Sequence, residues 1–325
     1  MSRVDTKLRA GNWVEVKAPE EIAHTLDADG ALDGLPFMPE MVEFCGKRFR
    51  VLRQARKACV EVRTQGPLID MRGFHGDAVW VFEGLRCDGA AHDGCQRGCL
   101  YYWKSAWLKK VGAEDLVLQA AQVPDGLLRH RLKSRAGPDR YFCQSTELVK
   151  ATKPLSVKGR LQLCVKDVWS GNVGVAAMVK MIVQPVFWKM VERFIRPRYV
   201  QGPLKQTPLI KLGLTRGEIV QIRPADKIKE TLNHKGCNRG LRYDIGLNEV
   251  CGTRHRVRDR LDKIIVESTG QMVQLQGTVT LEDSTCLCHM TALGGCSRQD
   301  LVYWREAWLK PVESANTSDI RQTCD

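Results

Sequence analysis

A cysteine- and glycine-rich loop that recurs near the other end of the chain constrains the fold more than any other feature. Residues 86–108 read RCDGAAHDGCQRGCLYYWKSAWL, and a related stretch at 286–309 begins CLCH and ends YWREAWL. Two copies of such a loop indicate the duplication of one ancestral unit. We therefore expect two similar domains, each organised around its own loop.

The duplication extends well beyond the loop. Residues 11–51 align with residues 217–257 at a constant offset and without a gap. The identities exceed those expected by chance from ordinary residue usage, and they include Gly30, Gly34 and Cys45. The sequence therefore predicts an internal repeat.

Short strands separated by turns predict a small β-barrel in each copy. Residues 11–17, 43–51 and 78–83 read as strands, and residues 19–26 read as a short helix. A tryptophan-rich segment ends each copy, and it is interpreted as core or as a lid over the barrel. Antiparallel barrels of the SH3-like kind suit this pattern, because closure removes exposed strand edges.

The segment between the copies has a different character. Residues 113–121 and 173–195 have helical apolar patterning, and Pro185 is expected to break the second of these. The second is interpreted as a broken helix packed between the barrels, with a membrane-surface or partner helix as the alternative. The expected fold is mainly β with a helical connector. Its domains would be an SH3-like unit at 1–111, the connector at 112–205 and a second SH3-like unit at 206–325.

Composition narrows the class of protein. The net charge of +13 favours an acidic partner or nucleic acid. The most apolar window, 173–195, carries several charged residues and makes a poor transmembrane span. No secretory signal is visible at the N-terminus, so a cytoplasmic protein is expected. In a reducing compartment the 13 cysteines are better explained by metal thiolates or free thiols than by disulfides.

Cysteines that recur in both copies predict metal sites. Cys45, Cys87 and Cys95 in the first copy correspond to Cys251, Cys286 and Cys296 in the second. A tetrahedral zinc ion needs a fourth ligand. The candidates are His92, Cys99 and Cys143 for the first site, and Cys288 and His289 for the second.

The sequence constrains the identity of the metal less than it constrains the candidate ligands. Zinc is the metal that this ligand set favours, and an iron–sulfur cluster is the alternative, since three thiolates with an open position also suit a cluster. Ordinary buried thiols, and disulfide or redox chemistry, are further interpretations of the same residues.

Arginines on one face of each of two predicted strands, called the basic strips here, suggest a different function. Arg48 and Arg50 fall on one strand face, and Arg254 and Arg256 repeat that pattern. Phosphate or nucleic-acid binding is one interpretation, and a solvated strand face is the other. The sequence carries no Walker loop, dinucleotide fingerprint, nucleophile elbow or His-Glu-x-x-His motif.

Several sequence segments resemble those of a bacterial family of cysteine-rich tandem-repeat proteins. They are GLPFMPEM at 34–41, CGKRFRV at 45–51, the loop at 87–108, CQSTEL at 143–148 and WREAWL at 304–309. The resemblance covers nearly the whole chain and implies two SH3-like units. The family has no agreed activity, so no reaction, substrate or ligand role comes from it.

The leading hypothesis is a cytoplasmic metal-thiolate protein that serves a bacterial biosynthetic pathway. Its metal would be zinc or part of an iron–sulfur cluster, with either a structural or a catalytic role. The alternatives are a nucleic-acid-binding module that uses the basic strand faces and a non-catalytic protein-interaction scaffold.

Overall fold

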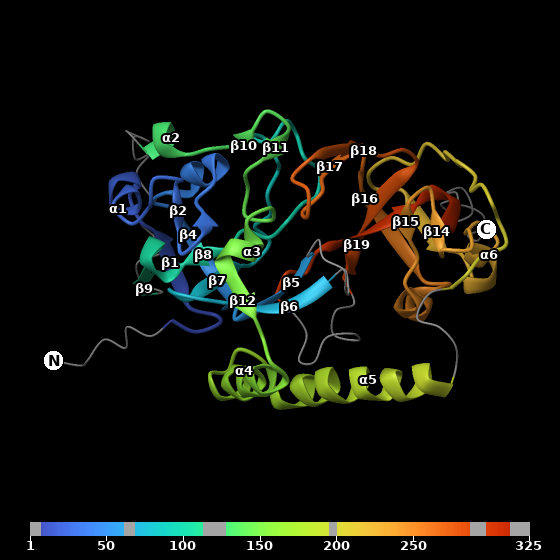
Figure 1. The fold of residues 1–325 in the computed structure, drawn as a ribbon, viewed down its shortest axis with the longest axis horizontal. Coiled ribbons are helices and arrows are strands. Elements are labelled where there is room, and N and C mark those ends of the chain that lie inside the picture. The colour runs from blue at the N-terminus through green and yellow to red at the C-terminus, as the bar shows by residue number, and fades with distance from the viewer. Residues whose placement is uncertain (1–7, 62–68, 113–127, 195–199, 287–296, 313–325) are drawn as a thin grey trace, which may run out of the picture. The chain divides into compact units, whose positions relative to one another are not determined.

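The computed structural model describes residues 8–61, 69–112, 128–194, 200–286 and 297–312, and it is mainly β (Figure 1). The helices are α1 (Pro19–Ala23), α2 (Leu128–Arg131), α3 (Leu148–Ala151), α4 (Val157–Trp169), α5 (Val175–Phe194) and α6 (Ala225–Lys229). Short 3₁₀ helices are η1 (Pro39–Phe44), η2 (Ser105–Trp107), η4 (Ile245–Val250) and η5 (Glu306–Trp308).

A five-stranded antiparallel sheet forms the core of the first copy, in the order β8-β7-β4-β1-β9. Its strands are β1 (Trp13–Val16), β4 (Arg48–Gln54), β7 (Val79–Phe82), β8 (Trp103–Lys104) and β9 (Leu108–Val111). Val14 and Val16 are fully buried and alternate with partly exposed residues along β1. This alternation turns one face of the strand towards the core.

The second copy repeats that sheet, in the order β20-β19-β16-β13-β21. Its strands are β13 (Ile219–Ile222), β16 (Arg254–Arg260), β19 (Thr278–Thr285), β20 (Leu301–Arg305) and β21 (Leu309–Pro311). Trp13 lies opposite Arg50 in the first sheet, and Ile219 lies opposite Arg256 in the second. The ungapped sequence alignment pairs these same positions, so strand order and register both repeat.

Smaller sheets surround these two. They are β2 (Ala31–Leu32) with β3 (Leu35–Pro36), β10 (Arg135–Gly137) with β11 (Arg140–Tyr141), β14 (Cys237–Asn238) with β15 (Leu241–Arg242), and β17 (Lys263–Ile265) with β18 (Met272–Gln274). A three-stranded sheet joins β5 (Lys57–Glu61), β6 (Ile69–Phe74) and β12 (Thr152–Pro154).

Aromatic side chains fill the core of the first copy. Trp103 stacks on Phe82 with ring centroids 5.1 Å apart, and Trp107 meets Phe37 edge-on at 5.1 Å. The indole N–H of Trp107 donates to Thr25 Oγ1 at 3.0 Å. In the second copy, Trp308 donates to Thr231 in the same way at 3.1 Å. The closing tryptophans are therefore core residues.

Contacts divide the chain into two compact units that do not follow chain order. The first comprises residues 1–191, 263–273 and 287–300, and the second comprises 192–262, 274–286 and 301–325. Segments of the second copy thus complete the first unit. The sequential domains 1–111, 112–205 and 206–325 stay a prediction.

Three predicted elements differ in detail. The strand expected from residue 43 begins at Arg48, because residues 39–44 form η1. The prediction that the helix breaks at Pro185 is wrong, because α5 runs through the proline as one 20-residue helix. The helix expected at 113–121 lies outside the described residues.

Among the helices that are described, none is both long and apolar enough to cross a membrane.

Candidate metal centre

Backbone hydrogen bonds close the loop of residues 87–99 at its base. Arg86 and Leu100 form an isolated antiparallel bridge, and the N–H of Cys87 donates to the carbonyl of Cys99 at 2.8 Å. Gly89 has a φ of +72°, and a Cβ there would lie 2.1 Å from the carbonyl oxygen of Cys95. Only glycine fits at this point, so the closed path of the loop depends on it.

A second segment brings one more cysteine to this loop. The N–H of Cys143 donates to Thr146 Oγ1 at 3.0 Å. The buried amide of Gln144 donates to the carbonyl of Tyr102 at 2.7 Å and accepts from the N–H of Tyr102 at 2.8 Å. Gln144 therefore fixes the Cys143 segment against the end of the loop.

Four thiols line one small cavity in the first unit. Cys87, Cys95 and Cys99 come from the loop and Cys143 from the segment after β11, around a space of about 30 Å³. Met38, Leu100 and Ile265 are among the other lining residues. A closed set of four sulfurs in an apolar pocket matches the ligand chemistry of zinc or of an iron–sulfur cluster.

The protein environment keeps the thiols of Cys87, Cys99 and Cys143 neutral when no cation is bound. Burial raises the pKa of Cys87, Glu40 and Cys99 raise it further, and the backbone N–H of Gly89 lowers it. Burial likewise raises the pKa of Cys99 to about 12, although the charge of Arg97 lowers it. Burial also raises the pKa of Cys143, against the N–H groups of Thr146 and Ser145. A metal would therefore have to displace protons.

Backbone donors point at three of the four sulfurs. A hydrogen bond from the backbone N–H of Gly89 lowers the pKa of Cys87. Hydrogen bonds from the backbone N–H groups of Ser145 and Thr146 do the same for Cys143. The N–H of Ile265 donates to Cys95 Sγ at 3.3 Å. Such donors stabilise thiolates, so the residues present fit a metal-thiolate group.

His92 lines the same cavity, but both of its ring nitrogens already have partners. Nδ1 lies 2.5 Å from Glu40 Oε1, and Nε2 lies 3.0 Å from the carbonyl oxygen of Phe142. Its ion pair with Glu40 is almost completely buried. Burial lowers the pKa of His92, but the hydrogen bond and charge of Glu40 outweigh burial and raise it. His92 thus acts as a cross-link between the loop, η1 and the Cys143 segment.

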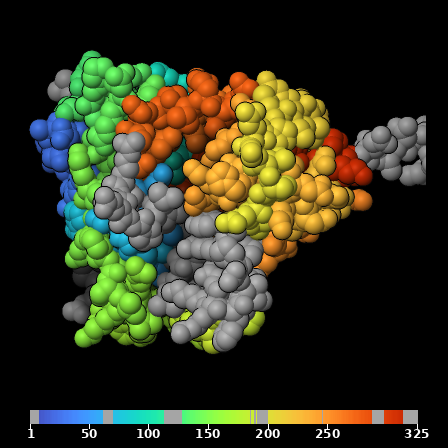
Figure 2. All heavy atoms as spheres, turned by 45° about the vertical axis from the view of Figure 1, so that its right-hand side comes forward, coloured from blue at the N-terminus to red at the C-terminus, as the bar shows by residue number. Residues whose placement is uncertain are grey.

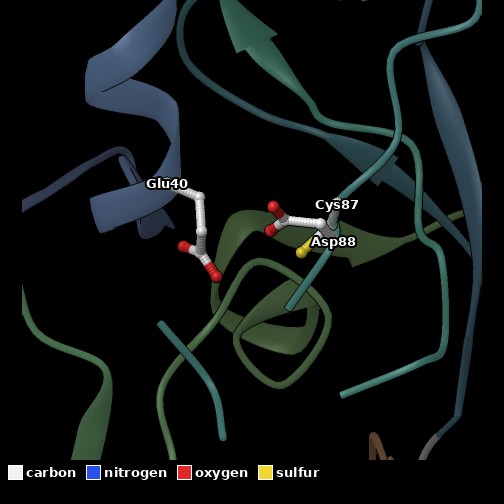
Figure 3. A group of neighbouring side chains, drawn as sticks. All are labelled: Glu40, Cys87 and Asp88. Atoms are coloured by element: carbon white, nitrogen blue, oxygen red, sulfur yellow. The ribbon is translucent and has the colours of Figure 1, made fainter. Parts of the chain in front are cut away.

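A second group of potential ligands lies beside the cavity. Possible ligand atoms of Glu40, Cys87 and Asp88 lie within 4.8 Å of one another, and Figure 3 shows these side chains facing each other. Glu40 is engaged by His92 and by the N–H of Ala91. This group offers a single sulfur, so the four-thiol set is the more complete site.

Residues from the second copy complete the first unit around this loop. The N–H of Gln96 donates to the carbonyl of Lys263 at 3.0 Å, and Arg97 donates to the carbonyl of Ile265 at 3.2 Å. Buried Glu267 pairs with Arg97 at 3.1 Å and with Arg298 at 2.6 Å.

Arg298 and Glu267 extend this network towards β5. Arg298 donates to the carbonyl of Cys59 at 2.8 Å, and Glu267 accepts from the N–H of Glu61 at 2.9 Å. Sequence reasoning missed both residues. No local motif marks them, because their partners lie in the other copy.

Among the other predicted ligands that the structure describes, Cys45, Cys251 and Cys286 are not lining residues of this cavity. Cys45 is buried near Glu20, and burial raises its pKa to about 12. Cys251 contacts Tyr243 through its thiol at 3.2 Å, and Cys286 follows the end of β19. Cys288, His289 and Cys296 lie outside the described residues. Cys45, Cys87, Cys95, Cys99, Cys143 and Cys251 form no disulfide.

The predicted basic strips carry paired arginines. Arg48 contacts Glu15 at 2.9 Å, and Arg50 contacts Glu83 at 3.6 Å. In the second copy, Arg256 contacts Glu282 at 3.8 Å. Neighbouring carboxylates therefore offset much of the charge on these faces, which weakens the case for nucleic-acid binding.

Comparison of the chain with protein-family models, curated proteins and solved structures gives no match. The resemblance to a bacterial tandem-repeat family stays a prediction.

Proposed function

We propose that the chain is a metal-thiolate protein whose ligands are Cys87, Cys95, Cys99 and Cys143. The observation that carries this proposal is that four thiols from two separate stretches line one apolar cavity. Four protein ligands complete the coordination of the bound group, so its role is structural or electron-transferring and not Lewis-acid catalysis at an open position.

The spacing of the sulfurs favours an iron–sulfur cluster over the zinc ion that the sequence favours. Tetrahedral zinc with Zn–S bonds of about 2.3 Å brings its sulfurs to about 3.8 Å from one another. Among the described residues, no three of these sulfurs lie mutually within 4.8 Å. A [4Fe–4S] cluster binds each of four thiolates through a different iron, so its sulfur ligands lie farther apart than those of a single zinc ion. Zinc binding would require the cysteine side chains to rotate inward.

Each copy is proposed to be an SH3-like barrel, with residues 112–205 as a largely helical connector. In both sheets the first strand lies between the second and the fifth, and a 3₁₀ turn precedes the fifth strand. This order supports the barrel proposal. The barrels would then act as the scaffold on which the cysteine loop is displayed.

Metal content of the full chain, purified anaerobically without added metal, tests the proposal. We expect iron and acid-labile sulfide with broad visible absorption, and Cys87→Ser or Cys143→Ser should remove most of both. Cys45→Ser and Cys237→Ser remove thiols that do not line the cavity and should leave metal content unchanged.

The possible results separate the two metals. Stoichiometric zinc without visible absorption, lost in the same two variants, would keep the metal-thiolate proposal and replace the cluster with zinc. Wild-type protein that holds no metal even after reconstitution with iron and sulfide, or with zinc, would refute the proposal.

A further inference from the structure

Exposed apolar side chains concentrate on two helices of the first unit. Of the large hydrophobic residues that are exposed in the described chain, all but Val149 and Leu209 belong to α4 or α5. Trp169, at the end of α4, is 89% exposed. An apolar surface of this extent marks an interaction site. The exposed residues are Val157, Leu161, Val165, Trp169, Val175, Val179, Val183, Val186, Phe187 and Met190.

Helical periodicity places these side chains in one stripe on each helix. In α4 every fourth residue from Val157 to Trp169 is exposed and apolar, and α5 repeats this from Val175 to Phe187. Residues four apart share a helix face. Figure 1 shows α4 and α5 together at the lower edge of the view, and the atoms of α4 reach the surface in Figure 2.

The inner face of α4 is anchored to the rest of the first unit. Buried Asp167 accepts from Arg56 at 2.7 Å, and Asn172, just after the helix, exchanges two hydrogen bonds with the backbone of Gln54. The apolar stripe lies on the opposite, exposed side. The helix therefore presents this stripe to something outside the unit.

Between residues 157 and 190, the exposed charges on the two helices are positive. Lys158, Lys166 and Lys180 are exposed on the two helices. Between residues 157 and 190 the only carboxylate is Asp167, which is buried in its pair with Arg56. A second copy of the chain would bring lysines against lysines, whereas acidic lipid headgroups would complement them and acyl chains would cover the stripe.

We propose that α4 and α5 form a docking surface for an anionic lipid bilayer. Neither helix spans the bilayer, so both lie in the interface with valine, phenylalanine and tryptophan side chains inserted among the headgroups. A 20-residue helix such as α5 covers about 30 Å of that surface. The surface is independent of the proposed metal centre, and it adds membrane recruitment to the proposed function.

Flotation of the full chain with vesicles tests this proposal. We expect binding to phosphatidylcholine vesicles that contain about 30% phosphatidylglycerol, at least about tenfold weaker binding to pure phosphatidylcholine, and loss of the difference as salt rises to about 0.5 M. The triple variants Leu161→Ser/Trp169→Ser/Phe187→Ser and Lys158→Gln/Lys166→Gln/Lys180→Gln should each weaken binding by at least about tenfold.

A matched variant in the second unit controls for general loss of charge and apolar surface. Leu209→Ser/Lys205→Gln/Lys211→Gln changes three exposed residues there and should bind vesicles as the wild type does. Circular dichroism establishes that each variant is folded. Absence of vesicle binding by the wild type would overturn the proposal, as would binding that neither helix variant weakens. Light scattering that shows a dimer, dissolved by the helix variants, in a protein without vesicle affinity would assign the face to a second copy instead.

Discussion

At the scale of single residues, the buried side chain of Lys104 in the first copy depends on one carboxylate. The Lys104 ammonium is fully buried and lies 2.9 Å from Asp33 Oδ2, with the carbonyls of His75 and Asp77 as further acceptors. Arg305 occupies the equivalent position in the second copy and donates to the carbonyl of Arg239. The copies thus satisfy a buried cation in different ways.

Replacing this carboxylate should destabilise the protein at neutral pH. Asp33→Asn is sterically mild because asparagine tolerates the φ of +50° at this position. It leaves the buried ammonium uncompensated, so we expect a loss of about 3 kcal/mol in the free energy of unfolding, measured by urea denaturation. Adding Lys104→Met should recover part of that loss. A double variant less stable than Asp33→Asn would contradict this account.

The same pair has a pH signature. Burial raises the pKa of Asp33, but the hydrogen bond from Lys104, the backbone N–H of Asp77 and the charge of Lys104 outweigh burial and lower the pKa. Its contribution to stability is therefore complete above the unfolded value of about 3.9, and it disappears as pH falls through the lower folded value. The difference between wild type and Asp33→Asn should shrink only at acid pH.

The backbone conformation of Gly89 shapes the loop that holds three of the proposed metal ligands. In Gly89→Ala the new Cβ would meet the Cys95 carbonyl at 2.1 Å, so the loop must open and the sulfurs separate. We expect metal content to fall severalfold in elemental analysis. Gly84→Ala has a similar positive φ with open space around the Cβ, so it should cost only about 1 kcal/mol of stability and leave metal content unchanged.

The sequence named the four cysteines of the cavity, although metal binding by them stays a prediction. Cys87, Cys95 and Cys99 share one glycine-rich loop, which is local information, whereas Cys143 was one further candidate from a separate stretch. His92 was predicted as a possible ligand, yet its nitrogens bind Glu40 and the carbonyl of Phe142. That outcome depends on tertiary contacts, which spacing along the chain does not encode.

At the scale of elements, the duplicated tryptophan–threonine contact should stabilise both sheets. Thr25→Val leaves the Trp107 indole N–H buried without its acceptor, so we expect a loss of about 1–3 kcal/mol in unfolding free energy by chemical denaturation. Thr231→Val should act similarly through Trp308. Thr253→Val, at an exposed position, is the control and should change stability by less than about 0.5 kcal/mol.

The repeat and the mainly β class followed from the sequence because alternation and identity at a fixed offset are visible there. The start of β4 and the continuity of α5 did not follow as readily. The apolar residues before Arg48 are buried by η1 as effectively as a strand would bury them. Pro185 removes one backbone bond, which a long helix tolerates.

At the scale of the whole molecule, the first unit requires parts of the second copy. A chain ending at residue 205 lacks Ile265, Glu267 and Arg298, and so leaves Arg97 without its buried partner. We expect this fragment to bind far less metal per chain than the full protein, by elemental analysis, and to unfold at lower temperature. Metal content equal to that of the full chain would show that the second copy is dispensable for metal binding.

Sequence alone placed domain boundaries in chain order because local patterns carry no sign of such interleaving.

Because segments of the second copy belong to the first unit, the first unit cannot finish folding until those segments have been synthesised. The hydrogen bond from Glu61 to Glu267 spans 206 residues, and that from Ser297 to Lys57 spans 240. At translation rates of about 5–20 residues per second, β5 waits on the order of ten seconds or more for these partners. The nascent first copy therefore emerges with an unfinished cysteine loop, and insertion of the proposed metal group would follow synthesis of nearly the entire polypeptide.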